Sequence, residues 1–272
     1  MTLQCQMRNV SRSVDLDVAT PPFWPEPPPL SMALCGPIVF GQDIRPEHIV
    51  EWVEYYRIMG VSKFFIPVYY TSPFSDVPAE LLWVLWYYED LELVEVVNWT
   101  LPVEIERKVH YNGQLAAING CVMKAYGYWD YVVVVDFDEY IISQDGTGLD
   151  AIVQKGSLDC VTIRHSAVKN SLSVPATSDD IGQHLVRHLQ RDSFVWPAND
   201  RTKYVCRPQS VLEAGIHFIH KIRPNARLLQ GANTEETLVL HFREALIGAG
   251  ATLVDVDMDR FFGLQRLPAA HG

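Results

Sequence analysis

The chain has 272 residues, of which 48% are hydrophobic and 20% are charged. These proportions are typical of a soluble globular protein with enough residues for one large domain or two small ones. The formal net charge of −11 and the absence of any Lys/Arg run argue against a nucleic-acid partner held through phosphate contacts. The sequence shows neither an apolar stretch long enough for a membrane span nor the apolar segment of a signal peptide.

The amino-terminal residues 1–31 are rich in proline and show no hydrophobic periodicity. We expect an extended, disordered linker or stalk there, outside the folded domain. The five cysteines have no C-x-x-C spacing, which excludes the usual zinc pattern. Their odd number leaves at least one thiol unpaired within the chain, and the cellular compartment stays open.

The first half of the domain is predicted to alternate strands with helices. Apolar runs indicate strands, and apolar residues that recur every three or four positions indicate helices. In chain order, the predicted elements are a strand over 32–40, a helix from about 46 to 59, a strand over 61–70, a helix through 81–88 and a strand over 91–99. This order predicts a parallel sheet with crossover helices.

A further helix is predicted over 111–126, directly before the strand that begins at Tyr131. Gln114 lies on or next to the apolar face of this helix. Its amide either satisfies a hydrogen bond in the core or contacts a ligand.

The second half is predicted to be mixed. A short helix is expected over 149–153, and strands are expected over 160–164, 203–208, 211–220 and 237–242. The connections between the last strands are too short for crossovers, so these strands are predicted to be antiparallel. Residues 169–200 are polar and weakly periodic, and we interpret them as an insertion or lid.

The most informative stretch is 131–140, in which a β-branched apolar run meets three carboxylates. A strand of this composition is predicted to be central and buried on both faces, so the charges must begin where the strand leaves the sheet. Ligands bind at that carboxyl edge in open α/β sheets. Asp136 and Asp138 should project to one side because side chains alternate, while Phe137 turns to the other. Two such carboxylates favour a hard divalent cation.

The alternative interpretation of Asp136 and Asp138 is a strand that ends in a solvated acidic turn, because short motifs often occur by chance. The buried strand before the motif favours the metal site. No G-x-G-x-x-G follows the first strand, and no P-loop or G-x-S-x-G motif occurs. The dinucleotide-binding, P-loop and α/β-hydrolase classes therefore lose their usual support.

Several segments in this order resemble glycosyltransferase family 92, whose known members include β-galactosyltransferases. The matching segments are 51–56 with 60–64, Tyr111 with Gln114, Ala117 and 119–121, Trp129, 136–141, 203–204 with 207–208, 215–217, and 241–243. The resemblance covers about residues 32–245 and implies a single α/β domain of the GT-A type. That fold is a Rossmann-like mixed sheet with helices on both faces. Residues 246–272 would then be a carboxy-terminal tail.

The sequence departs from the family in two respects. Gly120 stands where the family usually has an acid, so any polar role at that position is lost or moved. Family members usually carry an amino-terminal membrane anchor, and none is visible here. The resemblance therefore implies a Golgi-lumenal or membrane-associated protein, or else a soluble cytoplasmic relative.

The resemblance implies a metal-dependent transfer of a sugar, galactose, from a UDP-sugar to a glycan or other hydroxyl acceptor, with inversion. Mn²⁺ or Mg²⁺ held by Asp136 and Asp138 would stabilise the departing diphosphate as a Lewis acid. Tyr111 and Gln114 are further candidates for donor binding.

This chemistry also needs a general base and a third metal ligand. Glu213 is the first candidate for the base, with Asp200 behind it. His217 and His241 are candidates for the third metal ligand, since neutral imidazole binds Mn²⁺ acceptably. A histidine that only packs in the core or at the surface is the alternative for each.

Two other functions remain open at this point. A phosphatase of the haloacid-dehalogenase type also places Asp-x-Asp after an apolar strand, with Asp136 then acting as the nucleophile. That motif usually lies near the start of its domain and is followed by Thr or Val, whereas Glu139 follows here. A catalytically inactive relative that binds carbohydrate or nucleotide is the other candidate.

Overall fold

The structure is a computed structural model that describes residues 2–7, 10–15, 30–41, 44–69, 77–101, 109–143, 147–154, 157–169, 189–198, 200–242 and 252–256. Most of the proline-rich segment and most of the predicted lid, residues 170–188, lie outside these ranges. Within the described residues, β1 (Thr2–Met7) and β2 (Val10–Asp15) form an antiparallel hairpin that we did not predict.

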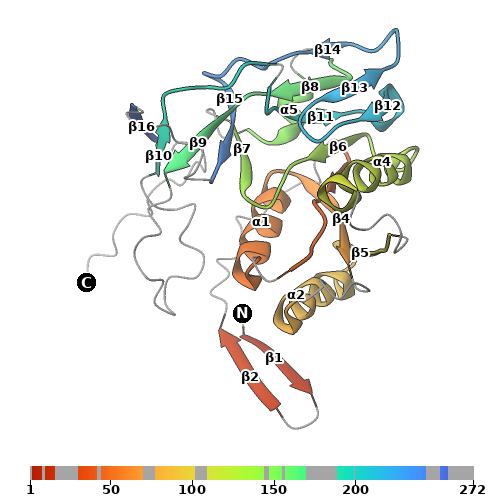
Figure 1. The fold of residues 1–272 in the computed structure, drawn as a ribbon, viewed down its shortest axis with the longest axis vertical. Coiled ribbons are helices and arrows are strands. Elements are labelled where there is room, and N and C mark those ends of the chain that lie inside the picture. The colour runs from red at the N-terminus through yellow and green to blue at the C-terminus, as the bar shows by residue number, and fades with distance from the viewer. Residues whose placement is uncertain are drawn as a thin grey trace.

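A seven-stranded sheet forms the centre of the domain (Figure 1). Its order is β14 (Leu228–Leu229), β8 (Cys160–Ile163), β11 (Lys203–Cys206), β6 (Tyr131–Val134), β3 (Met32–Cys35), β4 (Val61–Tyr69) and β5 (Val94–Trp99). Strands β6, β3, β4 and β5 are parallel, as predicted, and β11 is antiparallel to both β6 and β8. The strand that precedes the acidic motif is therefore the middle strand of the sheet.

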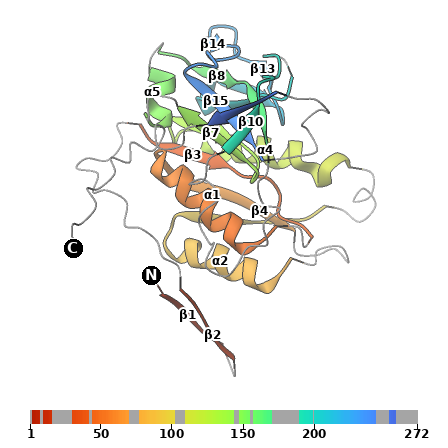
Figure 2. The same cartoon turned by 90° about the vertical axis from the view of Figure 1, so that its left-hand side faces the viewer.

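Helices cover both faces of this sheet. Alternate residues of β6 point to opposite sides, so Val133 joins the core beneath α1 (Pro46–Ile58) and α2 (Ala79–Asp90). Val132 joins the core beneath α4 (Gln114–Ala125). Figure 2 shows α1 and α2 side by side on their face. The predicted α/β fold, a mixed sheet with helices on both faces, is confirmed.

A second, five-stranded sheet was not predicted as such. Its order is β16 (Leu253–Val256), β10 (Leu189–Asp192), β9 (His165–Lys169), β15 (Thr237–His241) and β7 (Glu139–Ser143). Strand β15 is antiparallel to β7, as expected for the last strands, but parallel to β9. Because β7 starts at Glu139, the chain passes from the first sheet to the second through the acidic motif.

One prediction in the second half is wrong. The single strand expected over 211–220 is a hairpin of β12 (Val211–Ala214) and β13 (Ile219–Ile222), which follows a short 3₁₀ turn at Pro208–Ser210. At Gly215 an added Cβ would lie only 2.3 Å from the Phe218 carbonyl oxygen. The absence of a side chain there lets the chain reverse tightly, and alternation of residue types alone does not reveal such a turn.

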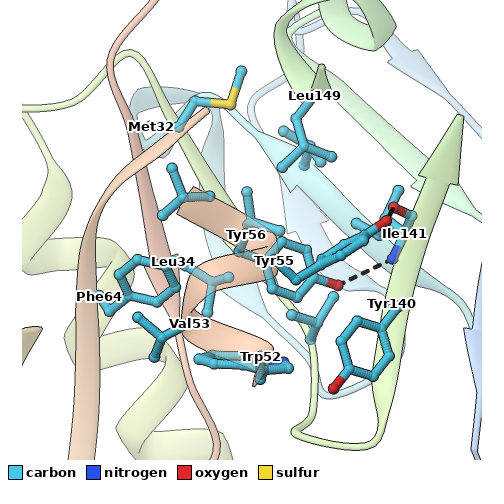
Figure 3. Packing of buried hydrophobic residues seen from close by; sticks show 14 of the residues in the cluster. Met32, Leu34, Trp52, Val53, Tyr55, Tyr56, Phe64, Tyr140, Ile141 and Leu149 are labelled. Carbon is cyan, nitrogen blue, oxygen red and sulfur yellow. Dashed lines mark hydrogen bonds between the residues drawn. The ribbon is translucent and has the colours of Figure 1, made fainter. Parts of the chain in front are cut away.

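Aromatic residues join the two sheets. Trp52, Tyr55 and Tyr56 of α1 are buried and pack toward Tyr140 and Ile141 of β7 (Figure 3). The Tyr56 hydroxyl donates to the Glu139 carbonyl at 3.0 Å and accepts from the Ile141 N–H at 3.1 Å. Helix α1 therefore fixes the start of β7 directly beside the acidic motif.

Two disulfides lie in the central sheet region: Cys35–Cys121 joins β3 to α4, and Cys160–Cys206 joins β8 to β11. The short helix α5 (Leu149–Gln154) follows β7 near the position predicted for it. Among the described residues, no helix combines the length and the apolar character needed to span a bilayer.

Candidate functional site

The site begins where β6 ends. Residues 131–135 are buried, and Asp136 is the first residue beyond them that reaches solvent, as the sequence predicts. Trp52 donates its indole N–H to the Asp136 carbonyl at 2.9 Å, and Phe137 packs edge-on against Trp52 at 4.8 Å. Phe137 therefore anchors the turn in the core. The side chains of Asp136 and Asp138, which flank it, lie on the opposite side of the turn.

The three carboxylates converge. Asp136, Asp138 and Glu139 each offer an oxygen, and these atoms all lie within 4.8 Å of one another. Carboxylate oxygens grouped in this way fit a hard divalent cation, whose charge would offset their repulsion. The predicted convergence of Asp136 and Asp138 is confirmed, and metal binding by them stays a prediction.

Lys203 is the cationic partner of this group. The register of β11 against β6 pairs Tyr204 with Val134, so Lys203 lies beside the end of β6. Its Nζ is 2.7 Å from Asp136 Oδ2 and 3.0 Å from Glu139 Oε2, although the side chain is 0% exposed. Burial alone would lower the pKa of Lys203, but Asp136 and Glu139 raise it above its ordinary value. The lysine is therefore charged at neutral pH.

Helix α4 contributes Gln114 at its first turn. Gln114 Nε2 donates to Asp136 Oδ1 at 3.1 Å, so both oxygens of that carboxylate accept a hydrogen bond. Tyr111 lies in the short 3₁₀ segment before α4, has a left-handed backbone (φ 48°), and is exposed. Tyr111 therefore lies at the surface, three residues before Gln114.

His241 of β15 contacts the second acid of the motif. Its Nε2 is 3.2 Å from Asp138 Oδ2. Burial opposes charge on both groups, but this hydrogen bond and the neighbouring charges lower the pKa of Asp138 and raise that of His241. The structure therefore brings one of the two predicted histidines into direct contact with the acidic motif.

Behind this contact lies a buried polar group. Glu139 is 0% exposed; its Oε2 accepts the Asp136 N–H at 2.8 Å, and burial raises its pKa to about 7 against the opposing effect of Lys203. His165 of β9 is also 0% exposed, and its ring centroid is 5.2 Å from that of His241. Burial, aided by the nearby cationic groups, lowers the pKa of His165 to about 3, so its imidazole is neutral.

The other predicted residues lie on the loop and hairpin beside Lys203. The His217 carbonyl accepts from the Thr202 hydroxyl, and burial together with Lys203 lowers the pKa of its imidazole to about 4. Glu213 lies on β12, where its carboxylate pairs with His220 at 3.1 Å and is 53% exposed. Asp200 lies in an exposed turn in which its N–H donates to the Pro197 carbonyl at 3.0 Å.

Sequence reasoning assigned no role to Lys203, Glu139 or His165. The sequence context of Lys203 could have indicated its role. A lysine at the start of an otherwise apolar strand must either pair with a buried acid or reach solvent. Nothing in the sequence indicated a role for His165, because its neighbours along the chain belong to no motif and its partners are distant in sequence.

The sequence profile of glycosyltransferase family 92 matches residues 31–258. A "Beta-1,4-galactosyltransferase galt-1" of Caenorhabditis elegans is 26% identical over 193 residues. That alignment covers 70% of this chain but only 43% of the relative, so the chain spans less than half of the relative's length.

Two solved structures are similar at low identity. Apo UDP-glucose pyrophosphorylase is 10% identical, with 86% of this chain and 96% of that chain covered and a TM-score of 0.35. Core-mannan synthase A from Aspergillus fumigatus, in its Mn/GDP form, is 12% identical, with coverages of 64% and 57% and a TM-score of 0.24.

Proposed function

Because this chain belongs to glycosyltransferase family 92, we propose that it transfers a sugar from a UDP-sugar to a hydroxyl group of a glycan, with inversion at the anomeric carbon. Galactose is the proposed sugar, since the similar protein of C. elegans is named a β-1,4-galactosyltransferase. The family match also favours glycosyl transfer over the phosphatase chemistry considered from the Asp-x-Asp motif.

One observation carries the proposal. Oxygens of Asp136, Asp138 and Glu139 lie within 4.8 Å of one another at the carboxyl end of the central strand. This is the edge of an α/β sheet at which ligands bind, and a nucleotide diphosphate needs a cation to approach three carboxylates.

Asp136 and Asp138 would hold the cation, Mn²⁺ or Mg²⁺. When bound, such an ion supplies Lewis-acid stabilisation of the charge that develops on the departing diphosphate. Lys203 and Gln114 keep Asp136 in place, because each donates to a different oxygen of its carboxylate. His217 stays a candidate for a third ligand, and Tyr111 a candidate for stacking on the donor.

The general base also stays a proposal. Glu213 is exposed enough to meet an acceptor, but its carboxylate is engaged by His220 in the free protein. Replacing Glu213 with Gln should lower the turnover rate at least a hundredfold and leave donor binding unchanged if it is the base. Asp200→Asn is the matching test for the second candidate.

The decisive experiment measures nucleotide binding with and without metal. We expect UDP to bind the wild-type chain with Mn²⁺ and to bind at least a hundredfold more weakly in EDTA. Asp138→Ala should remove the Mn²⁺-dependent binding, and Asp90→Ala, at an exposed position of α2, should leave it intact. A screen of UDP- and GDP-sugars for metal-dependent release of free nucleotide then identifies the donor. UDP binding that is equal with and without Mn²⁺ would exclude the proposed role of the two aspartates.

A further inference from the structure

The end of strand β5 carries a motif to which the proposed function assigns no role. Asn98-Trp99-Thr100 has the form Asn-x-Ser/Thr, which is the acceptor sequence for N-linked glycosylation. The sequence contains one other such motif, Asn9-Val10-Ser11, in which Asn9 lies outside the described residues. Three-residue motifs arise by chance, so the structural setting of Asn98 must decide between an accidental match and a modification site.

Both functional positions of the motif are presented to solvent. Asn98 and Thr100 are exposed, and neither side chain has a hydrogen-bond partner among the residues that the structure describes. Trp99 lies between them and is fixed in place. Its indole N–H donates to the Asn112 carbonyl at 2.9 Å, and its ring packs against the small apolar cluster that contains Ile38. The Asn98 amide and the Thr100 hydroxyl are therefore unengaged, on a segment that Trp99 holds to the domain.

Strand β5 is an edge strand. Within the described part of the chain it pairs with β4 alone and ends the order of the seven-stranded sheet. Alternate N–H groups of β5 point away from β4, and the one at Val96 donates to Glu89 Oε1 at 3.0 Å. By the same alternation, the Asn98 N–H faces the open edge. Such an edge invites pairing with a second chain unless something covers it, and a bulky polar oligosaccharide at Asn98 would supply the cover.

The two disulfides are an independent observation that bears on this motif. Cys35–Cys121 and Cys160–Cys206 join residues that are 86 and 46 positions apart in the sequence. Disulfides that persist in a folded domain are typical of oxidising compartments and rare in the cytosol. Secreted proteins fold in such a compartment, and their Asn-x-Ser/Thr motifs are glycosylated there. The cysteine pairing therefore places the chain where Asn98 can be modified.

We propose that Asn98 carries an N-linked oligosaccharide, attached in the oxidising compartment in which the two disulfides form. In that reaction the Asn98 amide nitrogen bonds to the anomeric carbon of a lipid-linked oligosaccharide. The bond from this carbon to the lipid diphosphate breaks, the diphosphate leaves with the electron pair, and the amide loses one proton. Thr100 supplies the hydroxyl that the glycosylating enzyme recognises. The modification is separate from the proposed sugar transfer, in which this chain is the catalyst and not the acceptor.

The oligosaccharide would lie beside the acidic motif and not over it. Strands β5 and β6 are parallel and end at the same edge of the sheet, but β3 and β4 lie between them. Three inter-strand spacings separate their ends by roughly 14 Å. Asn98 also alternates with Val94 and Val96, which pack in the core beneath α1 and α2, whereas α4 with Gln114 covers the opposite face. We therefore expect the oligosaccharide to leave nucleotide binding unchanged.

The test uses the chain purified from the cells that make it, so that it has passed through its own compartment. A peptide-N-glycosidase in water labelled with heavy oxygen converts a glycosylated asparagine to a labelled aspartate, and mass spectrometry of the peptides locates the label. We expect most of the Asn98 peptide to be labelled. Thr100→Ala should reduce this label at least tenfold, whereas Thr100→Ser, which keeps the hydroxyl, should retain it.

Two further measurements complete the test. Alkylation without a reductant should leave the four bridged cysteines unmodified. Asn98→Gln should bind UDP in Mn²⁺ as the wild type does, and should aggregate at a lower protein concentration because the edge of β5 is left bare. Three results would overturn the inference: no label at Asn98 in the wild type, a label that persists in Thr100→Ala, or alkylation of all four bridged cysteines. The first and third need no variant, so they decide the matter even if a variant does not fold.

Discussion

Lys203 Nζ lies 2.7 Å from Asp136 Oδ2, and no part of the lysine side chain is exposed. The two residues are far apart in sequence and meet because β11 is antiparallel to β6 in a register that places Lys203 beside the end of β6. The ammonium also reaches Glu139 Oε2 and the Ile216 carbonyl, at 3.0 and 3.3 Å. A single fixed cation therefore holds together the acidic motif and the loop that carries His217.

Replacing Lys203 with Met should destabilise the protein strongly, because it leaves Glu139 buried without its cationic partner. Breaking a buried pair in this way costs about 3–5 kcal/mol in the free energy of unfolding. Urea denaturation at pH 7 measures the effect. Lys124→Met is the matched control, since Lys124 pairs with Glu95 at the surface, with side chains 47% and 35% exposed. Its loss should cost about 0–1 kcal/mol. Equal costs for the two variants would contradict this account of Lys203.

Gln114→Ala should weaken metal-dependent nucleotide binding without unfolding the chain. The amide donates to Asp136 Oδ1 at 3.1 Å, and removing a residue that orients a metal ligand typically costs about 10–100-fold in affinity. Calorimetric titration of UDP in Mn²⁺ measures the change. Gln154→Ala, at the exposed end of α5, should bind like the wild type. Unchanged affinity of Gln114→Ala would show that the amide serves only the packing of α4.

Acid should remove the stabilisation that Asp130 provides. Its Oδ2 accepts from the Ser31 N–H at 2.9 Å and from the Ser31 hydroxyl at 2.8 Å, and these bonds hold the pKa of Asp130 below its ordinary value of 3.8. A lowered carboxyl pKa stabilises the fold above the pKa of the unfolded chain. That contribution is lost as the pH falls through the lower pKa of the folded state.

Asp130→Asn tests this pH dependence. The variant should be less stable than the wild type by about 1 kcal/mol at pH 7, since the carboxylate is partly exposed and its hydrogen bonds are correspondingly weakened. The difference should shrink as the pH falls below about 4. Urea denaturation at pH 7, 5 and 3 measures it. A difference that stays constant over this range would mean that the charge of Asp130 is not involved.

The acidic motif was predictable because its signal is local. An apolar β-branched run must be buried, so the charges at 136–139 must lie at its end, and the alternation of side chains sets the direction of Phe137. The partners of this motif were not predictable in the same way. Lys203 depends on the register of two distant strands, and His165 reaches His241 only because β9 and β15 are adjacent in the second sheet.

The alternation that predicts strands also produced the main error, the single strand expected over 211–220. Residues 211–214 and 219–222 each fit a strand, but they pair with each other through a tight reversal at Gly215. Composition shows that a segment is extended and does not show where it turns back, unless a turn signal such as Asn-Gly is present. The five-stranded sheet was missed for a related reason, since several of its strands are short and carry charged or polar residues.

Two glycines should respond to the same substitution with opposite signs. A Cβ at Gly215 would lie 2.3 Å from the Phe218 carbonyl oxygen, so Gly215→Ala must displace the loop whose carbonyl groups accept from Tyr204 and Lys203. We expect a loss of about 1–3 kcal/mol in the free energy of unfolding. Gly120 lies in α4 at an exposed position with no atom within 4 Å of an added Cβ, so Gly120→Ala should stabilise the helix by roughly 0.5–1 kcal/mol. Thermal unfolding of the two variants measures both effects, and a gain in stability for Gly215→Ala would show that the loop is not held as described.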